Sequence, residues 1–282
     1  MFSQEHPRWG IRELARALDM NAATVSRMVT TLHAAGFLEQ DALTQRYALG
    51  PSLVKLANRY VQQNPLPAYA RKTFESFADQ FEHNFYFGTL RGYHVIYLAV
   101  LDGRGRIKVV VEPGGSTGLH STALGKVLLA YQTDSFIETF LEENGLDPHT
   151  ANSISSAAEL WAQIHAIRRD GIAVNDGEHF EDIAAVAAPV FNRHHQVIAG
   201  VSLAYPRNLF GQGISLDMLI PLVREIAQLI TTYAVESFQN SATQADISPL
   251  LPPVFAEETI FARSAVHVTI TLAIVTKQCF NI

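Results

Sequence analysis

The sequence predicts an α+β protein with two domains, a small one of helices and a hairpin and a larger one built on an antiparallel sheet. The chain has 282 residues, more than one small core needs. Its first 50 residues show two amphipathic helices and a hairpin pattern. Farther along, strand-like runs fall into two groups with helices between them, without the alternation of strand and helix that marks a parallel sheet.

Residues 11–18 predict the first helix, because apolar side chains recur there at i, i+3, i+4 and i+7. Asp19 and Met20 interrupt the pattern. Asn21 is a suitable N-cap for a second helix over residues 22–35, where its side chain can accept from the backbone of the first turn. The stripe of this helix that we expect to face the core comprises Val25, Met28, Val29 and Leu32.

A hairpin is predicted after the second helix. Gly36 ends the helix, and residues 37–39 and 45–49 form short strand-like runs around a turn at residues 41–44. Two helices followed by a hairpin are expected of a winged helix-turn-helix, which places its second helix in the major groove of DNA. Periodicity alone leaves open an ordinary helical hairpin with a β-appendix.

The distribution of charge agrees with a DNA-binding first domain. The whole chain has a net charge of −6, which by itself argues against nucleic acid. Residues 1–60, however, hold seven Lys and Arg against five acidic residues, whereas residues 61–240 hold 12 against 19. Attraction to phosphate depends on the local patch, and this one is modest. We therefore expect two copies to bind a DNA operator together.

Four stretches of the first domain resemble the DNA-binding domain of the isocitrate lyase regulator (IclR) family of bacterial transcription factors. They are residues 20–27, 31–32, 35–38 and 46–50. Relatives typically carry a Ser-Thr pair where this chain has Ala23 and Thr24. The residues predicted to contact DNA lie at the start and outer face of the second helix and in the wing: Asn21, Ala22, Thr24, Ser26, Arg27, Thr31 and Arg46.

The larger domain is predicted to begin after a helical linker. Amphipathic helices are expected at residues 51–63 and 67–81. The remaining pattern predicts strands at 84–90, 93–101 and 106–111, helices at 121–131, 134–144 and 156–169, strands at 172–175, 184–191 and 196–204, and a helix at 213–238.

Segments of the larger domain also resemble the IclR family, in its effector-binding domain. They are residues 118–130, 167–174 and 187–191, and the similarity as a whole extends over residues 8–240. The resemblance implies a fold related to the small-molecule-sensing GAF domains. We expect a winged helix-turn-helix at 1–50, a linker helix at 51–66, the effector domain at 67–240 and an atypical tail at 241–282.

The resemblance also predicts departures at both ends. Relatives carry a further helix before the point where this chain begins, so the first helix is expected to be missing. In the tail, residues 249–253 look like a linker and residues 266–274 alternate like a strand. An alternative function follows: a ligand-binding sensor that has lost DNA binding through truncation.

The segment Ser121–Lys126 is the predicted effector site, because it opens a helix. Either Ser121 or Thr122 is expected to cap the helix, and its free N–H groups favour a small carboxylate. Lys126 either adds charge there, faces solvent or pairs with an acid. By position in the family, the residues lining the site are Leu119, Ser121, Thr122, Ala123, Asn175, Ala185, Ser202 and Ala204.

Two of these positions indicate how the effector differs from those of relatives. Some relatives have an acid in place of Asn175 and a cysteine in place of Ala185. The site here is therefore expected to be less charged and slightly larger, and its inducer to be a different one.

Other functions lack the residue patterns they need. His179 lies near Glu178 and Glu181 in one loop, but without a fixed metal-ligand spacing, and His194 and His195 suggest a solvent turn. No catalytic set, cofactor motif or membrane-length apolar run emerges, and Cys279 is the single cysteine. We expect a cytoplasmic regulator that is not an enzyme, a repressor rather than an activator, acting as a homodimer or dimer of dimers on double-stranded DNA under control of an organic acid.

Overall fold

The computed structural model describes residues 1–241 except residues 4–5, 80, 82, 106–110, 112 and 212. The described chain divides into two compact units, one ending at Asn64 and one beginning at Pro65. Most of the strand expected at 106–111, and the tail with its strand-like stretch, lie outside the described residues.

The first unit contains the predicted pair of helices and the hairpin. Its elements are α1 (Ile11–Ala17), α2 (Ala22–Ala34), β1 (Leu38–Gln40), β2 (Tyr47–Leu49) and α3 (Ser52–Gln63). Asn21 caps α2 as expected, with its side chain accepting from the backbone nitrogen of Ala23 at 2.8 Å. β1 and β2 pair antiparallel, with Leu38 opposite Leu49.

A small core holds this unit together, and one residue expected in it lies outside. Val25 and Val29 of α2 pack against Leu14 and Ala15 of α1, with Leu32 at the margin. Met28 is 41% exposed, so its predicted burial is wrong. α1 covers only the narrow strip of α2 that contains the two valines, and Met28 falls beyond it.

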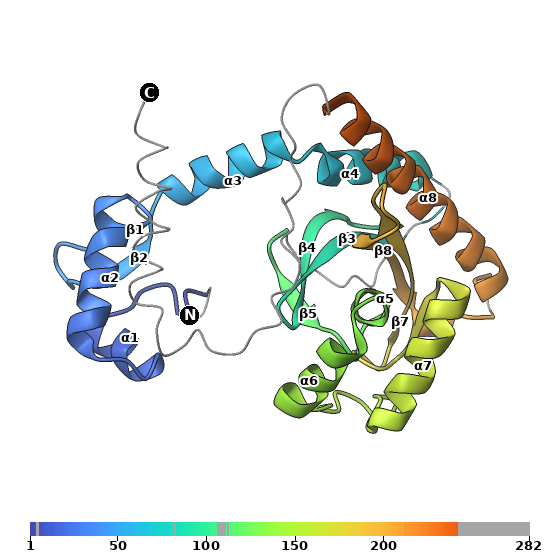
Figure 1. Ribbon diagram of the computed structural model, residues 1–282, viewed down its shortest axis with the longest axis horizontal. Coiled ribbons are helices and arrows are strands. Elements are labelled where there is room, and N and C mark those ends of the chain that lie inside the picture. Colours follow the sequence, from blue (N-terminus) through green and yellow to red (C-terminus); the bar gives the residue numbers. More distant parts are fainter. Residues whose placement is uncertain are drawn as a thin grey trace. The chain divides into compact units, whose positions relative to one another are not determined.

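The second unit is built on a six-stranded antiparallel sheet, as predicted (Figure 1). The strand order is β5-β4-β3-β8-β7-β6. The strands are β3 (Asn84–Arg91), β4 (His94–Leu101), β5 (Ser116–Gly118), β6 (Ala173–Asp176), β7 (Ile183–Phe191) and β8 (Val197–Pro206). The short β5 was not predicted. The turn between β7 and β8 contains His194 and His195, both exposed, which confirms the solvent turn.

Helices cover both faces of this sheet (Figure 1). One face packs against α4 (Pro65–Phe77) and α8 (Leu216–Ser241), the other against α5 (Ala123–Ala130), α6 (Asp134–Asn144) and α7 (Ala157–Asp170). Side chains alternate accordingly: Phe85 and Phe87 belong to the first core, whereas Tyr86 between them belongs to the second.

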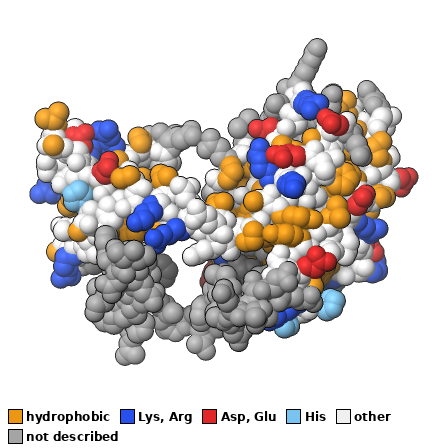
Figure 2. Space-filling view, turned by 90° about the horizontal axis from the view of Figure 1, so that it is seen from above, with side chains coloured by type: hydrophobic (Ala, Val, Ile, Leu, Met, Phe, Trp, Pro, Cys, Tyr) orange, Lys and Arg blue, Asp and Glu red, His pale blue; other side chains and the backbone are white. Residues whose placement is uncertain are grey.

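α8 packs with α4 on one face of the sheet and contributes many of the buried side chains there. By length and composition alone it would pass for a membrane span. Its buried side chains, including Val223, Ile226 and Ile230, pack against the sheet. Met218 and Leu229 of the same helix are exposed. Hydrophobic side chains also gather on the face of the molecule drawn in Figure 2.

Candidate functional site

The start of α5 is the centre of the candidate effector site. Of the two predicted caps, Thr122 acts: its Oγ1 accepts from the backbone nitrogen of Gly125 at 3.0 Å. Gly125 is required there, since a Cβ atom would lie 2.5 Å from the carbonyl oxygen of Leu119. The backbone N–H groups of Ala123 and Leu124 meet no acceptor among the described residues. The helix therefore presents free donors at its positive end.

Ser121, which is fully buried, is held from the side by residues near the end of β6. Its carbonyl oxygen accepts from Nδ2 of Asn175, and its Oγ lies 2.9 Å from Nδ1 of His179. The structure thus connects two predicted site residues, Ser121 and Asn175, through a direct hydrogen bond. It adds His179, which the sequence analysis considered only as a metal ligand.

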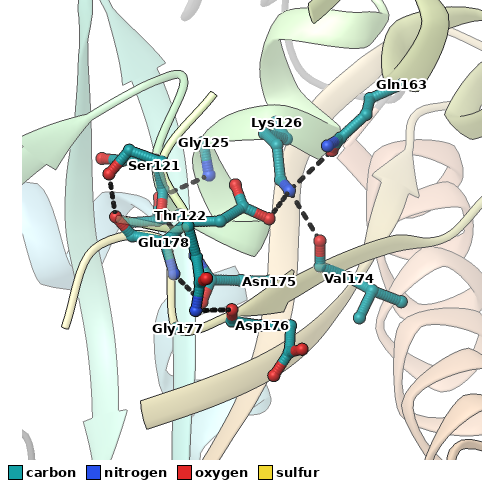
Figure 3. Close-up of polar contacts among 12 residues, drawn as sticks. Ser121, Thr122, Gly125, Lys126, Gln163, Val174, Asn175, Asp176, Gly177 and Glu178 are labelled. Atoms are coloured by element: carbon teal, nitrogen blue, oxygen red, sulfur yellow. Dashed lines mark hydrogen bonds and ion pairs between the residues drawn. The ribbon is translucent and has the colours of Figure 1, made fainter. Parts of the chain in front are cut away.

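Lys126 is fully buried and forms an ion pair, which settles the alternatives left open by the sequence. Its Nζ donates to Oε1 of Glu178 at 2.5 Å, to Oε1 of Gln163 at 2.7 Å and to the carbonyl oxygen of Val174 at 2.6 Å (Figure 3). Burial lowers the pKa of Lys126 and raises that of Glu178, while their mutual attraction opposes both shifts. The charge of Lys126 is therefore balanced inside the protein.

The second carboxylate oxygen of Glu178 is a notable exception to the pairing of buried polar groups. Oε2 is buried and has no hydrogen-bond partner among the described residues. Such an acceptor is costly to leave unsatisfied. Figure 3 shows the Glu178 side chain, which carries this oxygen, reaching Lys126 of α5.

Small side chains from three strands form the sheet face beneath α5. Asn175 pairs in register with Ala185, and Ala185 with Ala204. In the neighbouring row Ser202 pairs with Ala187. Leu119 and Ala123 belong to the same core cluster as Ala185, and Ala204 packs against it. The predicted effector residues are thus gathered at the start of α5 and on the sheet face that it covers.

Tyr86 and Asn84 of β3 are further polar residues of this sheet face. Tyr86 is opposite Ser202 in the pairing of β3 with β8, and its hydroxyl accepts from Nδ2 of Asn84 at 2.8 Å. Burial raises the pKa of Tyr86. Sequence reasoning missed both residues because their position depends on a strand register set by residues more than 100 positions away. The alternating pattern of residues 84–90 was the available signal.

A row of three histidines runs beside Ser121. The ring of His149 lies 5.8 Å from that of His120 and 4.5 Å from that of His179. Burial, together with the neighbouring histidines, lowers the pKa of His179 to about 4. Among the described residues, no three His, Cys, Asp or Glu side chains are grouped to hold a metal ion.

The predicted DNA-contacting residues lie in and beside α2 and in the hairpin. Asn21, Ala22, Arg27 and Thr31 are exposed, and Thr24 and Ser26 are partly so. Arg46 of the hairpin is exposed but forms an ion pair with Glu13 at 2.5 Å. Its guanidinium is therefore already engaged within the first unit.

Comparison with known proteins finds the same family in both units. The family model described as "Bacterial transcriptional regulator IclR C-terminal" matches residues 58–232, and the IclR helix-turn-helix domain matches residues 1–42. Among curated proteins, the HTH-type transcriptional regulator KdgR of Dickeya chrysanthemi is 28% identical over 203 residues, which cover 72% of this chain and 67% of that protein.

Solved structures share the fold. An IclR-type putative transcriptional regulator from Silicibacter sp. TM1040 is 26% identical with a TM-score of 0.75, covering 83% of this chain and 91% of its own. An IclR homolog from Microbacterium hydrocarbonoxydans, complexed with 4-hydroxybenzoate, is 19% identical with a TM-score of 0.65 and covers 82% and 93% of the two chains. At that identity the likeness is one of fold.

Proposed function

Because the chain belongs to the IclR family of bacterial transcriptional regulators, we propose that it binds an operator through α2 under the control of a small acid bound at the start of α5. The observation that carries the effector half of this proposal is the pair of free backbone donors, Ala123 N and Leu124 N. These donors lie at the positive end of α5, beside the buried Ser121.

The acid is proposed to bind to backbone donors rather than to a cationic side chain. Lys126 is neutralised by Glu178 and is fully buried, so it offers no free charge. Two or three N–H groups at a helix start are sufficient to hold a carboxylate. Ala185, Ser202 and Ala204 contribute small side chains to the sheet face beneath α5, and Tyr86 of β3 lies opposite Ser202 on the same face.

For DNA binding, we propose that Arg27 supplies the main contact of α2. Arg46 of the hairpin is proposed to contact a DNA phosphate. The other proposed DNA-contacting residues lie around Arg27: Asn21, Ala22, Thr24, Ser26 and Thr31. The modest positive charge of residues 1–60 supports binding by two copies, a homodimer or a dimer of dimers. The alternative of a sensor without DNA binding is set aside, because α1, α2 and the hairpin are all present.

We propose repression as the direction of control and the cytoplasm as the place of action. A dimer that occupies a palindromic operator excludes other proteins from the same DNA without any further contact. The named relatives are regulators, and no catalytic activity is proposed.

The test is thermal shift and calorimetry with a panel of small carboxylic acids that includes 4-hydroxybenzoate. Thr122→Glu places a carboxylate on the free donors, and Ser202→Leu fills the opposite wall, so both should abolish the stabilisation seen with the wild type. Thr133→Glu is the matched control, since Thr133 caps α6 in the same way. Normal binding by both site variants would place the effector elsewhere.

A further inference from the structure

The outer face of α2 carries few groups that can read a base edge through a pair of hydrogen bonds. Ala22, Ala23, Arg27, Thr30 and Thr31 are exposed. The helix, Ala22–Ala34, contains no Asn, Gln, Asp, Glu or Lys. Bidentate recognition of adenine uses Asn or Gln, and recognition of the cytosine amino group uses Asp or Glu. Within α2, Arg27 alone is suited to contact a base edge with two hydrogen bonds.

The polar groups at the two ends of this face are already engaged. Oδ1 of Asn21 accepts from the backbone nitrogen of Ala23 at 2.8 Å, so Asn21 cannot offer both amide atoms to adenine while it caps the helix. The hydroxyl of Thr31 donates to the carbonyl oxygen of Arg27 at 3.0 Å. His33 contacts the carbonyl oxygen of Leu38 at 3.0 Å through its Nδ1. On this face the exposed side chains of Ala22 and Ala23 are methyl groups, and the exposed Thr30 carries a methyl group beside its hydroxyl.

We propose that α2 recognises thymine by its 5-methyl group, through the methyl groups of Ala22, Ala23 and Thr30, beside one base or phosphate contact by Arg27. This inference rests on the proposed function, in which α2 lies in the major groove. Thymine alone among the four bases presents a methyl group there, and Ala and Thr side chains contact it. Burial of one methyl group corresponds to about a fourfold change in affinity.

The experiment begins with selection of duplexes from a random library by the full chain. Each thymine of the selected half-site is then replaced by deoxyuridine, which removes the methyl group and leaves all hydrogen-bonding groups in place. We expect about a fourfold loss of affinity per contacted methyl at one or more positions. Ala23→Ser replaces the apolar contact with a hydroxyl and should abolish the loss at one of them. Ala34→Ser, at the far end of α2, is the control and should leave every loss unchanged.

The possible outcomes distinguish failure of the thymine-recognition inference from failure of the proposed DNA binding. Selected duplexes that bind equally well with thymine and with deoxyuridine would overturn the inference while leaving DNA binding intact. A methyl-dependent loss that none of Ala22→Ser, Ala23→Ser and Thr30→Ser alters would overturn it as well. Failure to select any duplex would contradict the proposed DNA binding itself. Circular dichroism and the unfolding midpoint of each variant establish that the fold is retained.

Discussion

Nδ1 of His179 lies 2.9 Å from the hydroxyl of Ser121, so a residue that follows β6 contacts the residue preceding the N-cap of α5. The ring of His149 packs against the same imidazole in a T-shaped arrangement, with ring centroids 4.5 Å apart. Desolvation, together with the neighbouring His149 and His120, lowers the pKa of His179 to about 4, and the ring is therefore neutral near pH 7.

This lowered pKa predicts a loss of stability in mild acid. Between pH of about 6.5 and 4 the unfolded chain binds a proton at His179 that the folded protein does not, so the free energy of unfolding falls as the pH falls through this window. His179→Gln should flatten the pH dependence measured by urea unfolding. His194→Gln, in the exposed turn between β7 and β8, should leave it as in the wild type. Equal slopes for His179→Gln and wild type would contradict the prediction.

The buried ion pair predicts a large difference between single and double variants. Lys126→Met leaves the Glu178 carboxylate buried without its partner and should cost about 3–5 kcal/mol in the free energy of unfolding. Lys126→Met combined with Glu178→Gln removes both charges, and its stability should recover most of that loss. A double variant as unstable as Lys126→Met alone would show that the lost contacts to Gln163 and Val174 dominate.

Two glycines near the start of α5 should respond differently to alanine. A Cβ atom at Gly125 would lie 2.5 Å from one backbone oxygen and 2.6 Å from another, and backbone cannot move aside cheaply. Gly125→Ala should therefore destabilise the protein by about 1–3 kcal/mol, measured by thermal unfolding. At Gly118 the nearest atom is 3.8 Å away, an ordinary contact, so Gly118→Ala should be close to wild type.

Arg27→Ala should weaken operator binding without affecting the fold. Arg27 is exposed on α2, and one lost contact to a base or phosphate corresponds to a roughly 5- to 150-fold lower affinity. Anisotropy titration with a selected duplex measures it. Arg224→Ala, in the other unit, is the control. An unchanged affinity would show that α2 is not the principal reader.

The sequence predicted the elements whose signals are local. The cap at Asn21, the helix starting after Ser156 and the turn at His194 follow from neighbouring residues, and each lies where it was expected. Met28 was misplaced because helical periodicity shows which side chains are apolar, but not how wide a strip the partner helix covers. The polar partners of Ser121 and Lys126 could not be predicted from the sequence for a related reason. Asn175, His179 and Glu178 meet α5 only once the sheet has formed.

The contacts that surround the start of α5 are concentrated on one short turn of the chain. Asn175 is the third residue of β6, and Glu178 and His179 follow shortly after it, whereas the sheet itself is held by the buried rows of β7 and β8. The proposed effector residues therefore divide into this turn, which joins α5 through polar contacts, and Ala185, Ser202 and Ala204, which also belong to the paired strands of the sheet. Under the proposed function, substitution of Asn175 or His179 would change the regulator's preference among small acids, whereas substitution of Glu178 would also remove the partner of the buried Lys126.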